Sequence, residues 1–138
     1  LIIIIIMKRN TVQKRQVVDI MRRLGNHPSA EMVYDAVHIE HPSISKATVY
    51  RILKDEAEQG TLRNIDVPGG VHRYDHRTDD HWHIRCRRCG RICDVELSDV
   101  RLPEAVAPEG WNVENMSVIM SGLCADCCDA ELREAKSE

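Results

Sequence analysis

The chain has 138 residues, of which 43% are hydrophobic and 30% are charged, with a formal net charge of −3 at pH 7. This is the composition of an ordinary soluble protein, with room for one ordinary domain or two very small ones. Residues 1–75 carry 11 Lys and Arg against 9 Asp and Glu, whereas residues 76–138 carry 8 against 13. The first half is therefore the better candidate for contact with phosphate groups.

Six apolar residues, Leu1 to Ile6, precede Met7. The run is too short to cross a bilayer, and it lacks the basic flank and cleavage site of a signal peptide. We expect Met7 to be the natural start, the run to lie outside the native chain, and the protein to be cytoplasmic with no membrane partner. Disulfides are the less common use of cysteine in that compartment.

Three amphipathic segments follow, and Thr11, Ser29 and Ser45 are suited to cap their N-termini. Residues 25–28, residues 41–42 and Gly60 are expected to end them. Helical spacing predicts inward-facing apolar positions in each segment. They are Val17, Ile20, Met21 and Leu24, then Met32, Val33, Ala36 and Val37, then Val49, Ile52, Leu53 and Ala57.

Residues 61–66 and 71–75, joined by a turn at 67–70, are typical of a β-hairpin. Three short helices followed by a hairpin is the order of a winged helix, although many small α+β domains share it. We therefore predict an α+β fold, with a winged helix-turn-helix domain over 7–75, a polar linker over 76–80 and a small second domain over 81–138.

The second domain is expected to contain two strands, 81–86 and 91–97, around a tight turn. A short helix over 98–107 and one long alternating strand over 111–123 should follow, with a helical, charged tail from Cys124. A domain this small buries little surface, so a bound metal or a partner subunit would help to stabilise it.

Four cysteines form two C-x2-C pairs, with 34 residues between the pairs. Two such pairs can supply the closed tetrahedral shell of thiolates that a structural Zn²⁺ prefers, with redox-active thiols as the alternative. Gly90, directly after the first pair, lets the chain turn back on itself. Cys128 could replace Cys127, although the spacing favours Cys127, and Cys93 is either a buried apolar residue or a spare thiol. The predicted zinc ligands are Cys86, Cys89, Cys124 and Cys127.

A second group of donors contains only nitrogen and oxygen. His81 and His83 are two residues apart on a predicted strand and therefore share one face. Asp75 ends the predicted hairpin, and Asp94 lies on the next strand, from which it could approach the two histidines. Such donors suit Fe(II), Mn(II) or Zn(II). On spacing alone, a solvated His- and Asp-rich linker explains the pattern equally well.

Two motifs resemble the ferric uptake regulator (Fur) family. Residues 45–51, Ser-Lys-Ala-Thr-Val-Tyr-Arg, are similar to its A-T-V-Y-R recognition-helix signature, and residues 81–90 are similar to its H-x-H-x2-C-x2-C-G block. The resemblance runs from Thr11 to about Cys127. It implies a homodimer held by the C-terminal domain, a winged helix that binds a palindromic operator in double-stranded DNA, and a regulatory metal between the domains.

The resemblance is greatest to the peroxide-sensing repressor branch (PerR), in which three His and two Asp hold the regulatory Fe²⁺ or Mn²⁺. This implies the set His27, Asp75, His81, His83 and Asp94, with His27 and His81 as the residues oxidised by peroxide. The iron-uptake branch usually has Glu in place of the two Asp. Arg51, however, matches the iron branch, so an iron-responsive or other metal-uptake regulator is the alternative within the family.

In the expected recognition helix, Tyr50 and Arg51 would face the bases of the major groove, because Arg can pair with guanine and Tyr can contact a thymine methyl group. Partial core packing is the alternative for Tyr50. Lys46, Thr48 and Lys54 are candidates for phosphate contacts.

Other classes of protein fit less well. A zinc hydrolase or deaminase keeps an open metal position, which a four-cysteine site does not. A C-x2-C thiol redox enzyme needs a thioredoxin-like setting that is not visible here. A zinc-ribbon interaction module would leave the upstream winged helix unexplained. We therefore expect a transcriptional regulator, not an enzyme.

Overall fold

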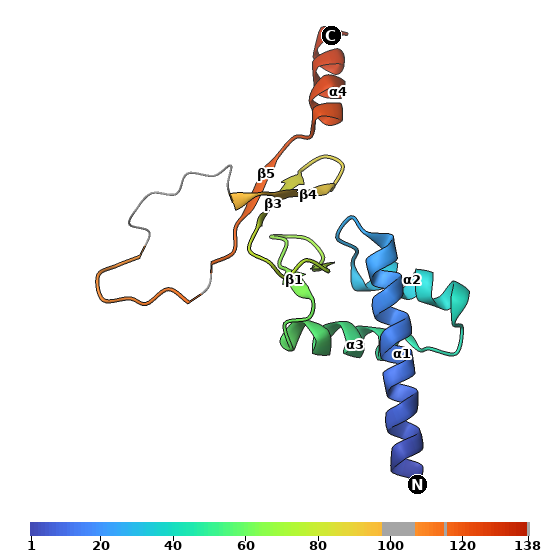
Figure 1. Cartoon of the computed structure of the whole chain (residues 1–138). Helices are drawn as coiled ribbons and strands as arrows, with labels where there is room; N and C mark the ends of the chain where they lie inside the picture. Colours follow the sequence, from blue (N-terminus) through green and yellow to red (C-terminus); the bar gives the residue numbers. More distant parts are fainter. Residues whose placement is uncertain (98–106, 115, 138) are drawn as a thin grey trace. The chain divides into compact units, whose positions relative to one another are not determined.

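The computed structural model describes residues 1–97, 107–114 and 116–137, and the chain divides into two compact units, Leu1–Thr78 and Asp79–Glu138 (Figure 1). The order of elements is three helices, a pair of strands, three further strands and a helix. The α+β class predicted from the sequence is confirmed. None of the helices in the described part of the chain has the length and hydropathy that a membrane crossing requires.

The first unit consists of α1 (Ile2–Leu24), α2 (Ala30–Glu40) and α3 (Lys46–Glu58), followed by the hairpin of β1 (Arg63–Ile65) and β2 (Arg73–Asp75). Ser29 and Ser45 cap α2 and α3 as predicted, because their hydroxyl groups accept from the amides of Met32 and Thr48. One apolar core holds the unit together, and it is formed by Val17, Ile20, Met21, Val33, Val37, Ile44, Val49, Ile52, Leu53, Leu62 and Tyr74.

Three predictions about these helices were wrong. Helix α1 begins at Ile2, well before Thr11, because no Gly or Pro interrupts residues 2–10, and the Thr11 hydroxyl donates to the Met7 carbonyl one turn back instead of capping. Leu24 was expected to face inward but is 37% exposed at the C-terminal end of α1. Met32 was also expected to face inward but is 44% exposed. It lies beside the buried Val33 at the edge of the apolar face of α2, where a 100° step per residue turns it outward.

The second unit contains a three-stranded sheet of order β4-β3-β5, with β3 (Trp82–Cys86) at its centre. β4 (Ile92–Val95) pairs antiparallel with β3, and β5 (Ile119–Gly122) pairs parallel with it. Helix α4 (Ala125–Lys136) follows β5 directly, which confirms the predicted helical tail (Figure 1).

The long strand predicted over 111–123 is reduced to the four residues of β5. Its partner β3 has only five residues, so among the described residues of 111–118 the pairing is reduced to one hydrogen bond, from the His83 amide to the Val118 carbonyl, and Trp111 is 74% exposed. The short helix predicted over 98–107 falls on residues 98–106, which lie outside the described part of the chain.

Candidate metal centres and recognition helix

Four cysteine sulfurs converge in the second unit, within 4.8 Å of one another. Cys86 ends β3, Cys89 lies in the turn to β4, Cys124 is the N-cap of α4, and Cys127 lies in the first turn of α4. The sulfurs of Cys89 and Cys124 are 3.8 Å apart. Sulfurs placed tetrahedrally at about 2.3 Å from one zinc ion would be about 3.8 Å apart, so this pair already has the spacing that a Zn²⁺ site requires.

The turn between β3 and β4 positions the first two sulfurs. The amide of Gly90 donates to the carbonyl of Cys86 at 3.0 Å, and the amide of Cys86 donates to the carbonyl of Arg91 at 2.8 Å. Gly90 has φ +76, a left-handed conformation that glycine adopts without steric strain. The resulting bend brings the Cys89 amide to 3.5 Å from the Cys86 sulfur.

The electrostatics of the cluster also favour a cation. The pKa of the Cys86 thiol is lowered to about 5, chiefly by the Cys89 amide. The pKa of Cys127 is raised to about 12, because its thiol is hydrogen-bonded to Cys124, because it is buried and because the neighbouring sulfur disfavours a second negative charge. Four thiolates therefore need a positive ion among them, which Zn²⁺ could supply.

The two remaining cysteines lie apart from this cluster. Cys128 is exposed, with its sulfur 3.8 Å from the Leu123 carbonyl, so the structure places Cys127 and not Cys128 with the other three sulfurs. Cys93 is also exposed. Of the two alternatives for Cys93, exposure favours a spare thiol over a buried apolar residue, because Ile92 occupies the inward position on β4 and its neighbour points to the opposite face.

Three arginines of the β3–β4 turn form ion pairs with acidic residues of α4, a feature that the sequence analysis missed. Each pair joins the two segments that carry the cysteines. These pairs are Arg87–Glu131 at 3.2 Å, Arg91–Asp126 at 3.3 Å, and Arg88–Glu134. The basic residues of the turn and the acidic residues of the C-terminal segment are visible in the sequence, although the sequence alone does not show which charges form pairs. All of these side chains are at least one-third exposed, so each pair contributes little on its own.

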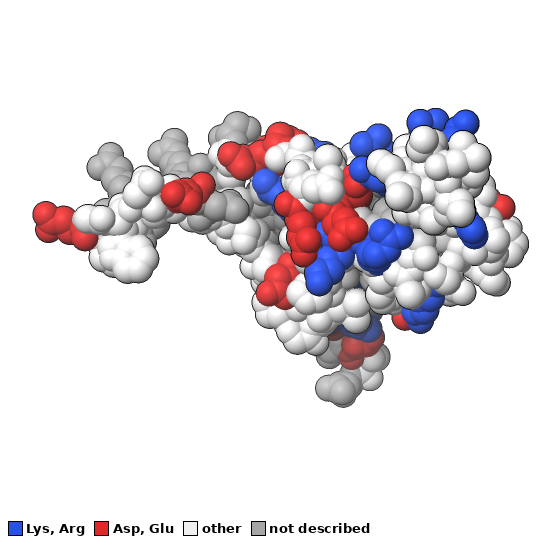
Figure 2. Space-filling view, turned by 90° about the horizontal axis from the view of Figure 1, so that it is seen from below, with Lys and Arg blue, Asp and Glu red and all other residues white. Residues whose placement is uncertain are grey.

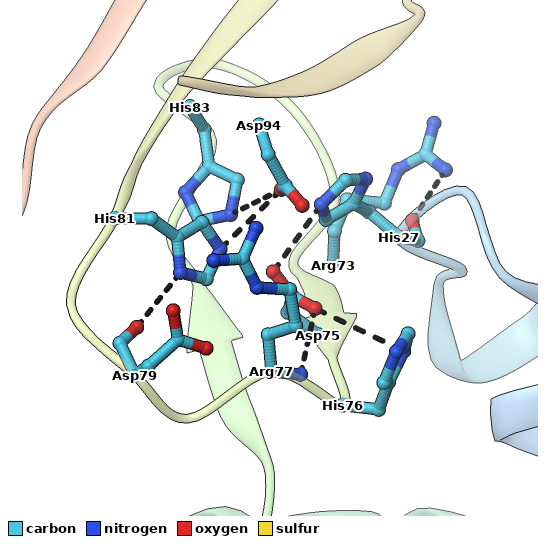
Figure 3. Close-up of polar contacts among 9 residues, drawn as sticks. All are labelled: His27, Arg73, Asp75, His76, Arg77, Asp79, His81, His83 and Asp94. Atoms are coloured by element: carbon cyan, nitrogen blue, oxygen red, sulfur yellow. Dashed lines mark hydrogen bonds and ion pairs between the residues drawn. The ribbon is translucent and has the colours of Figure 1, made fainter. Parts of the chain in front are cut away.

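The second unit also holds a cluster of two histidines and one aspartate. The pairing of β3 with β4 places His83 opposite Asp94. The Nε2 atoms of His81 and His83 lie 3.3 and 3.4 Å from the same oxygen, Oδ1 of Asp94 (Figure 3). Both rings are almost completely buried, and their centroids are 4.6 Å apart.

A backbone contact indicates which ring nitrogen of His81 carries a hydrogen. Its Nδ1 lies 2.7 Å from the carbonyl oxygen of Asp79, and because a carbonyl can only accept, Nδ1 must carry the hydrogen. In the neutral ring, Nε2 then presents its lone pair on the side of Asp94. This is the arrangement in which a histidine is ready to bind a metal, with its second nitrogen oriented by an outer partner.

The first unit holds the other two candidate ligands, which also contact each other. Nε2 of His27 lies 3.3 Å from Oδ2 of Asp75, and both side chains are buried, with exposures of 10% and 3%. His27 sits in the connection between α1 and α2, and Asp75 ends β2. Asp75 Oδ1 also accepts from the Arg77 amide at 2.9 Å, which orients the carboxylate (Figure 3).

The candidate DNA-contacting residues lie on α3. Tyr50 is 39% exposed, and Arg51 is half-exposed, with its guanidinium 3.7 Å from Asp55. The Lys46 ammonium lies 5.7 Å from the ring centroids of both Tyr34 and Tyr50, and 3.7 Å from Glu31. These positions leave polar groups of α3 accessible to a ligand.

Two further candidates on α3 differ from each other. The Thr48 hydroxyl accepts from the Ser45 hydroxyl at 2.9 Å, so it contributes to the helix cap, whereas Lys54 is exposed. Figure 2 shows Lys and Arg side chains interspersed with Asp and Glu side chains on the face that it draws. Contacts with DNA would therefore depend on individual basic residues more than on one broad positive field.

Comparison with known proteins gives a consistent answer. The chain is 29% identical to the peroxide-responsive repressor PerR of Staphylococcus saprophyticus, over 88% of this chain and 83% of the relative. It is 36% identical to the transcriptional regulator FurA of Mycobacterium tuberculosis, over 80% of this chain and 78% of the relative.

A solved structure, the Campylobacter jejuni peroxide stress regulator, aligns with a TM-score of 0.67 and 28% identity, covering 85% of this chain and 89% of the regulator. A model of the ferric uptake regulator family matches residues 7–121, which is most of the chain. Together with the four-cysteine cluster and the histidine and aspartate residues on β2, β3 and β4, this match shows that the protein is a member of the ferric uptake regulator family, whose members are metal-responsive transcriptional regulators.

Proposed function

We propose that this protein is a DNA-binding repressor that senses hydrogen peroxide through iron-catalysed oxidation of histidine. The observation that carries the proposal is the chemistry of the donor sets, three imidazoles and two carboxylates with no sulfur. His81, His83 and Asp94 supply three donors in the second unit, and His27 with Asp75 supplies two in the first. The relatives named as peroxide-responsive repressors support the same reading.

The spacing within each donor set suits a divalent ion. Ligand atoms about 2.1 Å from one ion and at right angles to one another lie about 3 Å apart. The three nitrogen-to-oxygen distances of 3.3, 3.3 and 3.4 Å are close to that value. Neither two nor three donors fill the shell of Fe²⁺ or Mn²⁺, so we propose that both sets bind one ion together, while the four cysteines bind a structural Zn²⁺.

A single ion held by ligands from both units would couple them. It would fix the angle between the winged helix and the second unit, and in a homodimer that angle sets the spacing of the two recognition helices on a palindromic operator. Metal would thereby select the DNA-competent state, by no more than its difference in affinity for the two states. On α3, Arg51 and Tyr50 would contact bases, with Lys46, Thr48 and Lys54 as candidates for phosphate contacts.

Bound Fe²⁺ would activate hydrogen peroxide beside its protein ligands and would return to its starting oxidation state. The imidazole ring of His81 or of His27 would supply the two electrons: a ring C–H carbon takes up one peroxide oxygen, and the other oxygen leaves as water. The oxidised ring is a poorer ligand because its electron distribution and hydrogen positions change. Loss of one ligand would release the angle between the units and, with it, the operator.

The experiment compares iron-loaded and manganese-loaded protein, both retaining zinc, after treatment with low concentrations of peroxide. Peptide mass spectrometry should find one added oxygen on His27 or His81 with iron alone, together with loss of operator binding. Unmodified histidines, with DNA binding lost only through cysteine oxidation, would replace this proposal by a thiol mechanism.

An iron-responsive regulator is the second candidate, and the Arg51 side chain, which matches the iron branch, favours it. In that case iron would be the signal itself and not the reagent of oxidation. Operator binding that follows Fe²⁺ concentration and survives peroxide unchanged, with all histidines unmodified, would support this candidate over the first.

A further inference from the structure

The segment that carries His27 has an unusual backbone. Gly25, Asn26 and His27 have φ values of +57, +53 and +55. Left-handed backbone is ordinary for glycine, whereas a side-chain-bearing residue rarely adopts it, and two such residues in succession need contacts that hold them. The conformation is part of what turns the imidazole toward Asp75, so the holding contacts determine where this ligand lies.

Strand β2 provides those contacts. The Arg73 guanidinium donates from Nη1 to the carbonyl oxygen of His27 at 3.0 Å (Figure 3). The amide of Tyr74 donates to the carbonyl of Pro28 at 2.9 Å, and Ser29 forms an antiparallel bridge with Arg73. Of these contacts, only the one made by the guanidinium depends on a side chain that a substitution can remove.

Arg73 and Asp75 are two residues apart on one strand, so their side chains leave the same face of β2. Arg73 reaches the backbone of His27, and Asp75 reaches its ring. The strand therefore holds one residue at two points, and both the position and the orientation of the imidazole depend on it.

We propose that Arg73 is a positioning residue for His27, which keeps the left-handed backbone in place and so presents the imidazole to the regulatory metal. The proposal rests on the function proposed above. Removing a positive charge near a bound cation would by itself strengthen cation binding. A weaker affinity in an Arg73→Met variant would therefore have to come from lost positioning and not from charge.

The test uses the full-length, zinc-loaded protein and Mn²⁺ as the probe. Arg73→Met should weaken Mn²⁺ binding about 10- to 100-fold, the usual effect of removing an outer partner of a metal ligand. Arg22→Met, which removes an exposed arginine on α1, is the matched control and should bind Mn²⁺ like the wild type. In a His27→Ala background, Arg73→Met should change the affinity less than about twofold, since the ligand that it positions is already gone.

A second readout needs no added manganese. In Arg73→Met, hydrogen exchange of the Tyr74 amide should accelerate, because its acceptor is the carbonyl of Pro28 next to His27, while the amides of α3 keep their protection. An additive loss of affinity in the His27→Ala background, or unchanged affinity with a protected Tyr74 amide, would overturn the role of Arg73. If His27→Ala alone leaves Mn²⁺ affinity unchanged, the proposed ligand set fails, and the Tyr74 exchange rate then decides separately whether Arg73 holds the segment.

Discussion

Replacing Cys127 with serine should remove the zinc from this protein, whereas replacing its neighbour Cys128 should not. The two thiols are adjacent in the chain, which makes the two substitutions a matched pair. Cys127 is 9% exposed and lies among the other three sulfurs. Cys128 is exposed and lies near the Leu123 carbonyl. Serine is nearly isosteric, so the comparison tests coordination more than packing.

The size of the effect follows from how little else stabilises the second unit. Among its described residues, the buried apolar side chains are Trp82, Ile92 and two of the clustered cysteines, Cys86 and Cys127. Burial of Trp82 and Ile92 contributes roughly 3–6 kcal/mol at about 1.5–3 kcal/mol for each side chain. Structural zinc contributes about 10–16 kcal/mol in zinc-finger peptides at neutral pH. The free energy lost with the metal is therefore larger than the free energy that burial of Trp82 and Ile92 contributes.

The assay measures zinc content per subunit, thermal unfolding by circular dichroism and mass by light scattering. Cys127→Ser should contain little zinc, lose the unfolding transition of the second unit and become monomeric, and Cys128→Ser should stay within about 0.5 kcal/mol of the wild type, as surface substitutions do. The reasoning is refuted if Cys127→Ser retains one zinc per subunit with an unchanged transition, or if Cys128→Ser loses its zinc.

Three further outcomes are expected. His83→Ala should keep the zinc and the fold but lose operator binding activated by Mn²⁺, as measured by gel retardation; equal binding with and without Mn²⁺ in the wild type would refute the switch. Arg51→Ala should keep Mn²⁺ affinity and lose about 1–3 kcal/mol of operator affinity at its base pair, as measured by fluorescence anisotropy. The third concerns Glu56: burial alone would raise its pKa, but hydrogen bonds from Lys14 and Thr61 outweigh burial and hold the pKa below its ordinary value of 4.5. The charged Glu56 carboxylate therefore stabilises the folded state at pH values above 4.5, and this contribution is lost as the pH falls through the lowered pKa. The free energy of unfolding in urea should accordingly be higher for the wild type than for Glu56→Gln, and this difference should become smaller below pH 4.5. A difference that does not depend on pH would contradict this account.

The sequence predicted those parts of the fold that local chemistry determines. Ser29 and Ser45 precede helical apolar patterns, and a side-chain oxygen at such a position satisfies amides that no other group in the helix can reach. The order of helices and hairpin, the strands beside the first cysteine pair and the helical tail follow from similarly local patterns. The convergence of the four cysteines was predictable because their spacing matches the geometry that one metal imposes.

The rest depended on neighbours that are distant in the chain. The alternation in residues 111–123 suits a strand, but only the segment that lies beside β3 has a partner for its backbone, and that limit is not visible in the alternation itself. Arg73 looked like an ordinary strand residue, because its acceptor lies in a loop before α2. The left-handed backbone at His27 was equally hidden, since histidine gives no conformational signal of the kind that glycine gives.

Burial separates the two routes by which peroxide could act on this protein. Cys93 and Cys128 are exposed and stand outside the four-sulfur cluster, so peroxide from solution can reach them with or without iron. The His81 side chain has no exposed surface and that of His27 has 10%, and an imidazole reacts poorly with peroxide from solution. Oxidation of these rings therefore requires a reagent produced beside them, which only a bound redox metal can supply. An oxygen atom found on a buried histidine with iron, but not with manganese, would therefore identify oxidation by the bound metal. Oxidation of an exposed thiol cannot do so, because it occurs with either metal.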